Sequence, residues 1–177
     1  CDSIDFINSL LSFCNLQAVC DIFIYLHFKN LSMDLHNVFL HAHRGFAYLI
    51  LLIVALFIVS LLAVMFGYSG KINKLLRKST LFTMILFHLQ FLIGIAMLVF
   101  SPGLKAALES GTLMSDSYNR VTFVEHPFSM LVAAILLTII NKYLKKNETL
   151  ALKVVFMGVL ALLLFGYAFP WAKVFGA

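Results

Sequence analysis

The chain has 177 residues, of which 62% are hydrophobic and 12% charged, and its formal net charge is +5. Soluble domains are about 45–50% apolar and about 25% charged, so a soluble fold of this length could not bury so much apolar surface. The composition therefore favours a protein surrounded by a lipid bilayer. Because the basic residues gather in two short loops and no phosphate loop, nucleic-acid motif or zinc-finger spacing occurs, we expect no nucleic-acid partner.

The first part of the chain, residues 1–32, is apolar but interrupted by polar side chains. Asp5 and Asp21 would each cost about 2.5–3.5 kcal/mol at the centre of a spanning helix, so this segment is a poor membrane span. It also lacks the basic start, clean apolar core and small-residue cleavage site of a signal peptide. Two interpretations remain open: an interfacial helix, or an artefact preceding a natural chain that begins at Met33.

Residues 33–177 form the predicted domain, with four apolar segments. The predicted helices cover residues 41–66, 81–100, 121–140 and 150–170. Each has an apolar core of about 20 residues, which crosses about 30 Å of hydrocarbon. Ser101-Pro102-Gly103 is expected to end the second helix, because proline cannot continue a helix. The sequence thus predicts an all-α, polytopic membrane protein with a four-helix, up-down-up-down transmembrane bundle.

The loops predict the orientation of this bundle. Loops 67–80 and 141–149 are basic, whereas loop 101–120 balances its two basic residues with two acidic ones. The positive-inside rule therefore places the two basic loops in the cytoplasm. Loop 101–120 and both ends of the bundle are expected on the periplasmic side of the inner membrane.

Ionisable side chains at membrane depth are costly and usually functional, so the few in the predicted helices define the candidate site. In chain order these are His41, His43, Arg44, His88 and His126. The first and third helices run in the same direction and are diagonal partners, so His41 or His43 could face His126. Two such imidazoles suit the iron of a b-type haem, with Arg44 and Arg120 near its propionates. Small residues one turn beyond the histidines would leave room for a flat ring: Gly45, Ala47 and Ser129.

Each histidine also has a purely structural explanation. His41 and His43 could be interfacial residues, and Glu125-His126-Pro127 could mark only a helix start. His88 is expected to face the bundle interior roughly 12 Å deep, where it could bind haem, relay protons or hydrogen-bond Gln90 or a carbonyl. Counting from the cytoplasmic helix ends separates His43 and His126 by roughly 13 Å in depth, which weighs against a simple pair.

A metal-ion site is the second chemical possibility, because imidazoles and carboxylates gather on the outer side. The candidate ligands are Asp34, His36, His41, His43, Glu125 and His126. His41 and His43 are two residues apart and point in different directions on a regular helix, and no histidine pair at i and i+4 occurs. No nucleophilic catalytic site, whether Ser-His-acid or cysteine-based, can be recognised in the sequence. Whether the protein is an enzyme therefore stays open.

Three motifs carry a family resemblance. They are Leu40-His41-Ala42-His43-Arg44, His88-Leu89-Gln90 through Gly94 to Ser101-Pro102, and Glu125-His126-Pro127. Over residues 33–171 they resemble the small four-helix bacterial inner-membrane proteins of the "cytochrome b" type. The layout is more distantly similar to one half of a haem A synthase. The resemblance implies haem b as cofactor, with ligands among His41, His43, His88 and His126. The lack of a second histidine on helix two, and of any on helix four, argues against two haems.

The resulting expectation is a haem b-binding electron carrier or redox-chain subunit in the bilayer, with other respiratory membrane subunits as its partners. Two alternatives stay open. One is a cofactor-free accessory subunit of a larger membrane complex, and the other is a metal-binding or transport protein that uses the outer histidines.

Overall fold

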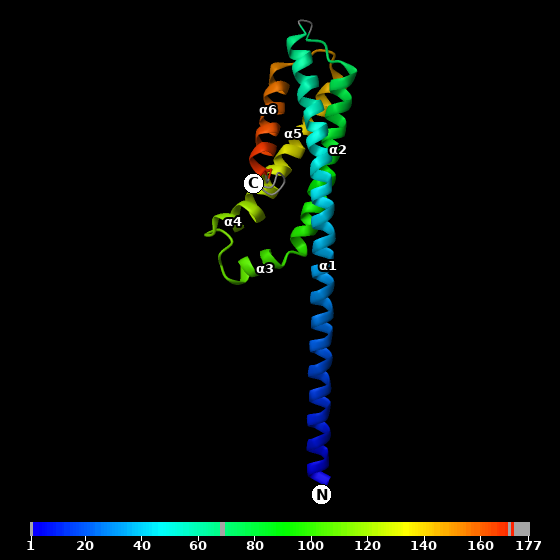
Figure 1. Ribbon diagram of the computed structural model, residues 1–177, viewed down its shortest axis with the longest axis vertical. Helices are drawn as coiled ribbons and strands as arrows, with labels where there is room; N and C mark the ends of the chain where they lie inside the picture. Colours follow the sequence, from blue (N-terminus) through cyan, green and yellow to red (C-terminus); the bar gives the residue numbers. More distant parts are fainter. Residues whose placement is uncertain (1, 68–69, 170, 172–177) are drawn as a thin grey trace.

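The computed structural model describes residues 2–67, 70–169 and 171, and side chains from Asp21 onward except those of residues 23 and 28–30. The described residues form helices and no strands (Figure 1). Four helices lie alongside one another: α1 (Asp2–Phe66), α2 (Lys74–Val99), α5 (His126–Lys146) and α6 (Leu152–Ala168). Between α2 and α5 come α3 (Pro102–Glu109), α4 (Ser117–Arg120) and a π-helical turn (Val121–Glu125).

Helix α1 is a single helix of 65 residues, and its N-terminal half extends far beyond the other helices (Figure 1). The prediction that the first helix begins near His41 is therefore wrong, although its end at Phe66 is confirmed. The physical reason is that neither proline nor glycine interrupts the chain before Gly45. Helix α1 contacts α2 as far back as His36, whose Nδ1 donates to the Met97 carbonyl oxygen at 3.2 Å.

Within the described residues, three segments are long and apolar enough to cross a membrane: Ile24–Phe66, Lys74–Val99 and Ser117–Lys146. Helix α6 is also apolar but has only 17 residues, or about 25 Å of length. The predicted end of the fourth helix at Pro170 lies outside the described residues.

Helices α2 and α5 extend beyond their predicted apolar cores at the end of the bundle that carries the basic loops, here called the basic end (residues 67–80 and 141–151). Helix α2 begins at Lys74, where the side chain of Asn73 accepts a hydrogen bond from the Leu76 amide at 2.7 Å. Helix α5 continues to Lys146 rather than ending near residue 140. Lysine and arginine are good helix formers, so a prediction from apolar residues alone starts α2 too late and ends α5 too early.

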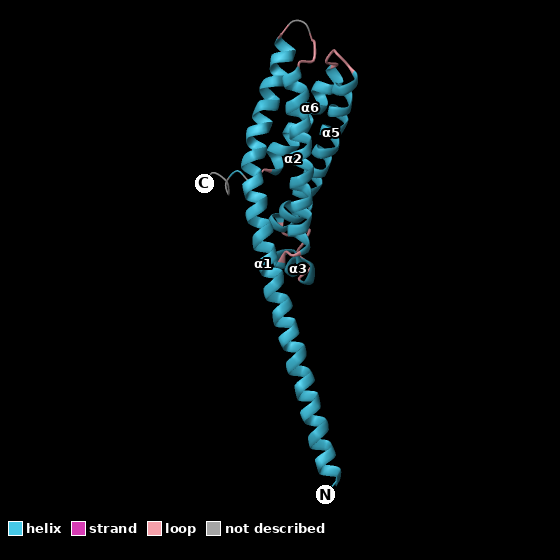
Figure 2. Cartoon of the chain, turned by 90° about the vertical axis from the view of Figure 1, so that its right-hand side faces the viewer, coloured by secondary structure: helices cyan, strands magenta, loops and turns pink. Residues whose placement is uncertain are grey.

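Helix α1 packs along α2, α2 along α5, and α5 along α6 (Figures 1 and 2). Helix α6 also packs against α1 at Gly158, where a Cβ would lie 3.5 Å from Leu61 and 3.6 Å from Phe57 of α1. The buried core is built from aliphatic and aromatic side chains of all four helices. One polar pair crosses it, since the hydroxyls of Ser60 and Ser79 lie 2.8 Å apart between α1 and α2.

The two loops of the basic end bind each other. The Ile72 amide donates to the Glu148 carbonyl at 2.7 Å, and the Leu150 amide donates to the Gly70 carbonyl at 2.9 Å. Arg77 of α2 donates to the carbonyls of Leu144 and Asn147 at the C-terminal end of α5. These bonds satisfy carbonyls that a helix end leaves free, and they hold the four helices in register.

The opposite end of the bundle has a longer connection. Helix α2 ends at Val99 as predicted, and α3 starts at Pro102 with the hydroxyl of Ser101 accepting from the Leu104 amide at 3.2 Å. The chain then returns through α4 and the π-helical turn into α5. This return places His126 at the first position of α5, facing His43 of α1.

Candidate functional site

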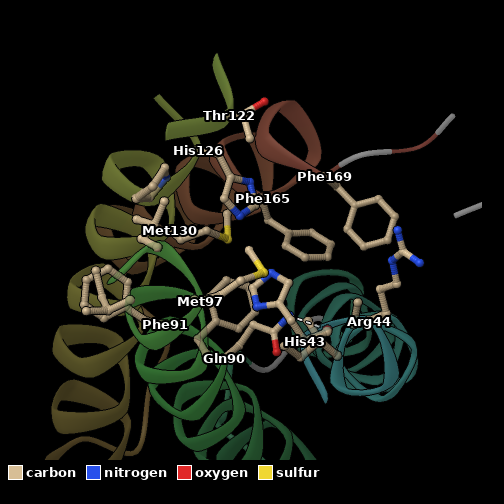
Figure 3. Close-up of a pocket in the computed structure, with 17 residues that line it drawn as sticks. His43, Arg44, Gln90, Phe91, Met97, Thr122, His126, Met130, Phe165 and Phe169 are labelled. Carbon is tan, nitrogen blue, oxygen red and sulfur yellow. Dashed lines mark hydrogen bonds between the residues drawn. The ribbon is translucent and has the colours of Figure 1, made fainter. Parts of the chain in front are cut away.

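His43 of α1 and His126 of α5 face each other across the bundle. Their ring centroids are 6.1 Å apart, and the ring planes are inclined by 64° (Figure 3). Both residues are half-buried, because α2 and α6 cover them from the sides. The sequence-based expectation that one histidine of the first helix meets His126 is thus met by His43.

The depth difference expected from the sequence is much smaller in the structure. His126 starts the 21-residue helix α5, and about 24 residues of α1 lead from His43 to Phe66. The two imidazoles therefore differ by roughly three residues, or about 4.5 Å, rather than 13 Å. The larger value is wrong because α5 continues to Lys146, more than one turn beyond the predicted end of the third helix.

A partly open cavity with a free volume of about 90 Å³ lies beside the two imidazoles (Figure 3). A single buried water needs only about 10–15 Å³ of such space, so the cavity has room for a larger group. Its apolar lining includes Ala47, Ile50, Phe87, Phe91, Gly94, Met97, Met130, Phe165 and Phe169. Its polar lining consists of His43, Arg44, Gln90, Thr122 and His126. An apolar group with an affinity for imidazole matches this combination.

Helix α6 fixes the ring of His126. The Nδ1 of His126 donates to the carbonyl oxygen of Ala168 at 2.7 Å. Ala168 is the last residue of α6, so its carbonyl has no partner within the helix. This bond commits Nδ1 as the protonated nitrogen and leaves Nε2 as the atom that can bind a metal.

The ring of His43 packs against a glycine of α2. A Cβ on Gly94 would lie 3.4 Å from Cε1 and 3.7 Å from Nδ1 of His43. The Nδ1 atom is buried and has no hydrogen-bond partner among the described residues. Gln90, one turn earlier on α2, donates from Nε2 to the main-chain oxygen of His43 at 2.8 Å. Helix α2 therefore contacts both the backbone and the ring of this histidine.

The distance between the rings suits two ligands of one metal atom. An imidazole nitrogen lies about 1.1 Å from its ring centre, and metal–nitrogen bonds are about 2.0–2.1 Å, so two in-line imidazoles have centroids about 6 Å apart. The observed 6.1 Å agrees with this value. Within the described part of the chain, no cluster of three or more His, Cys, Asp or Glu residues could hold a metal ion. Any further ligands must come from another residue type or from a cofactor.

His41 and Arg44 lie differently from His43. The side chain of His41 is exposed and does not line the cavity, as expected for a residue two positions from an inward-facing one. Arg44 is exposed at the edge of the cavity and points away from the imidazoles (Figure 3). Of the small residues expected to leave room, Ala47 lines the cavity, whereas a Cβ on Gly45 would have nothing within 4 Å.

The prediction that His88 faces the bundle interior is wrong. Its side chain is exposed, Nδ1 donates to the Met84 carbonyl at 2.7 Å, and Nε2 lies 3.5 Å from the hydroxyl of Thr138. These neighbours on α2 and α5 satisfy the ring at the surface, so a place in the core is not needed. His88 does not line the cavity.

Arg120 is engaged in an ion pair rather than directed at the cavity. Its Nε donates to Glu125 Oε1 at 2.8 Å, and the hydroxyl of Tyr167 donates to Oε2 of the same carboxylate at 2.6 Å. Glu125 and His126 therefore bind the consecutive α6 residues Tyr167 and Ala168. This double contact attaches the last turn of α6 to the wall of the cavity.

Several lining residues were not predicted as parts of the site, among them Gly94, Met97, Met130 and Phe165. Met and Phe are ordinary core residues, so no local sequence signal separates those that line a cavity. Gly94 could have been found from the sequence, because a glycine inside a membrane helix often marks a close approach of another group.

No protein-family model matches the chain, and no curated protein or solved structure shows significant similarity to it.

Proposed function

We propose that this protein crosses a bacterial inner membrane four times, binds a b-type haem between His43 and His126, and carries electrons. The observation that supports this most directly is the 6.1 Å separation of the two imidazoles beside an apolar cavity. Haem iron bound by two imidazoles is a common electron-transfer centre in helical bundles.

The surface of the bundle supports the membrane setting. Large apolar side chains are exposed on every long helix, such as Leu52, Leu92, Ile135 and Leu163. So many exposed apolar residues favour lipid as the surroundings. With the basic end in the cytoplasm, the imidazoles belong to the periplasmic half of the membrane. Other redox subunits of the membrane would be the partners.

The residues present fit a haem group. The unpaired Nδ1 of His43 and the cavity beside it indicate a site whose polar atoms lack a partner among the described residues. Ala47 and Gly94 keep the space next to His43 free of bulky side chains. Arg44 at the edge of the cavity supplies a cation for a propionate. When bound, haem supplies one-electron chemistry, and the protein orients its iron and excludes water from it.

The test is a reduced-minus-oxidised absorbance spectrum of the purified protein in detergent, with and without added haemin. We expect a low-spin b-type spectrum in the wild type. His43→Ala and His126→Ala should each abolish it, because each removes one axial ligand. His41→Ala and His88→Ala are matched controls, since neither side chain lines the cavity, and both should keep the wild-type spectrum.

A colourless wild-type protein that takes up no haemin would contradict the proposal. An unchanged spectrum in His43→Ala would contradict the ligand assignment even if haem is bound. Folding of each variant is checked by its helical circular dichroism, so loss of the spectrum can be separated from loss of the fold.

A soft metal ion is a second candidate, favoured by two sulfur atoms near the imidazoles. Met97 and Met130 line the same cavity as His43 and His126 (Figure 3). Thioether and imidazole ligands together suit Cu(I). Metal analysis should then find about one copper per chain, and Met97→Leu with Met130→Leu should remove it. In the haem proposal the same double variant keeps the b-type spectrum.

A further inference from the structure

Gln90 is held against α1 in one orientation. Its side chain is only 7% exposed, and Nε2 donates to the main-chain oxygen of His43 at 2.8 Å. A carbonyl oxygen can only accept, so the NH₂ group must face it and the amide oxygen must face elsewhere. Gln90 lines the cavity, and its amide oxygen is buried without a hydrogen-bond partner among the described residues.

Two buried polar atoms at this place lack partners among the described residues. They are Oε1 of Gln90 and Nδ1 of His43, which are not hydrogen-bonded to each other in the structure. The first is an acceptor, and the second becomes a donor when it carries the proton of the imidazole. Buried polar atoms in proteins are usually paired directly or through a bound water, and these two are complementary.

His126 shows how the second ring nitrogen of a candidate metal-binding histidine is hydrogen-bonded in this protein. Its Nδ1 donates to the Ala168 carbonyl at 2.7 Å, which leaves Nε2 with the lone pair. Metal-binding histidines usually donate their second ring N–H to a carbonyl or carboxylate, which fixes the tautomer and raises ligand basicity. At His43 the side-chain amide of the cavity lining, Gln90, can take this role.

We propose that Gln90 is a positioning residue that holds His43 at two points. Its Nε2 binds the main-chain oxygen, and its Oε1 serves as the acceptor for the Nδ1 proton of the ring. This selects the tautomer in which Nε2 of His43 carries the lone pair for the ligand. The part of this inference that concerns the iron rests on the proposed function, whereas the choice of tautomer does not.

The experiment compares wild type, Gln90→Met, Gln90→Glu and Thr83→Val. Methionine has the length of glutamine but no amide, and glutamate keeps the acceptor without the NH₂ group. Thr83 is the matched control, because it is buried on α2 and its hydroxyl donates to the Ser79 carbonyl of its own helix. Each protein is labelled with ¹⁵N-histidine and studied first without haem and then with haemin.

Without haem, the ¹⁵N shifts should show His43 with its proton on Nδ1 in wild type, Gln90→Glu and Thr83→Val. In Gln90→Met the ring should become a mixture of tautomers. With haemin, Gln90→Met should bind about 10–100-fold more weakly than wild type. Gln90→Glu should lower the midpoint potential, because a carboxylate acceptor makes the imidazole a stronger donor to ferric iron.

The possible failures are distinguishable. If the wild type binds haem but Gln90→Met has the wild-type tautomer and haemin affinity, the role of Gln90 is refuted and the haem proposal stands. If the wild type takes up no haemin, the haem proposal fails, and the tautomer spectra alone decide the role of Gln90. A loss of affinity in Thr83→Val equal to that in Gln90→Met would assign the effect to general instability and also refute the inference.

Discussion

Gly94 is the residue that determines how closely α2 approaches His43. An alanine Cβ would make ordinary contacts of 3.4 and 3.7 Å with the ring, whereas a branched side chain would place further atoms against it. We expect Gly94→Ala to retain haem binding and to gain up to about 1 kcal/mol in unfolding free energy from helix propensity. Gly94→Val should weaken haemin binding by a factor of about ten or more, as measured by absorbance titration.

Gly45 is the matched control for this prediction. It lies on α1 near the same histidine, but nothing is within 4 Å of its Cβ position. Gly45→Val should therefore leave haemin affinity unchanged. Equal losses in Gly94→Val and Gly45→Val would mean that contact with the His43 ring is not the cause.

At the scale of single residues, the sequence predicted the histidines as site residues but did not show which of them face the cavity. Whether His43 or His41 faces His126 depends on how α1 is rotated about its axis relative to α2. That rotation is set by packing partners that are distant in sequence. The rule that ionisable residues face the interior failed for His88, because the Met84 carbonyl and Thr138 satisfy its ring at the surface. Gln90 was visible as a polar residue, but its contact with His43 was not.

At the scale of elements, the π-helical turn explains a contact that helical periodicity does not predict. Residues five apart do not face each other on an α-helix, yet Arg120 and Glu125 form an ion pair at 2.8 Å. The turn from Val121 to Glu125 makes i to i+5 hydrogen bonds, which align such residues. No single residue in this segment signals the π form, so the sequence predicted Arg120 near the haem propionates rather than in an ion pair with Glu125.

Arg77 provides a prediction at the same scale, because it links α2 to the end of α5. Its guanidinium donates to two carbonyls at once, at Leu144 and Asn147. Lysine keeps the charge but cannot reproduce this fork. Arg77→Lys should lower the unfolding free energy by about 1.5–3 kcal/mol, measured by denaturant titration in mixed micelles.

The neighbouring Lys78 is the control for Arg77. Its side chain is exposed, so Lys78→Gln should change stability by less than about 0.5 kcal/mol. A destabilisation by Lys78→Gln as large as that by Arg77→Lys would show that charge at the basic end, rather than the two hydrogen bonds, stabilises the bundle.

At the scale of the whole molecule, the helical class and the apolar helices were predictable from composition and length alone. Long, periodic apolar segments are the strongest signal in a sequence. The exact helix ends and the extent of α1 were not predictable in this way, because they depend on helix-forming residues outside the apolar cores. Between α2 and α5 the chain forms the short helices α3 and α4, whose N-termini are capped by the side chains of Ser101 and Asp116. Such caps define short helices only when the neighbouring chain is already folded.

The orientation of the whole molecule can be tested by cysteine labelling. The natural cysteines Cys1, Cys14 and Cys20 are first replaced by serine, and single variants Glu109→Cys and Glu148→Cys are made at exposed positions. In intact bacterial cells, a membrane-impermeant maleimide should label the first variant and not the second. After the membrane is broken, both should react. The reverse pattern in intact cells would contradict the proposed orientation.

The attachment of α6 to His126 also bears on how the chain matures. His43 and His126 both leave the ribosome before Ala168 is synthesised, and the helices of a membrane bundle insert before they pack. Until the last helix arrives, Nδ1 of His126 lacks the carbonyl that fixes its proton, and the wall formed by Phe165 and Phe169 does not yet exist. The nascent protein thus passes through a stage in which both imidazoles are present and their side of the bundle is still open.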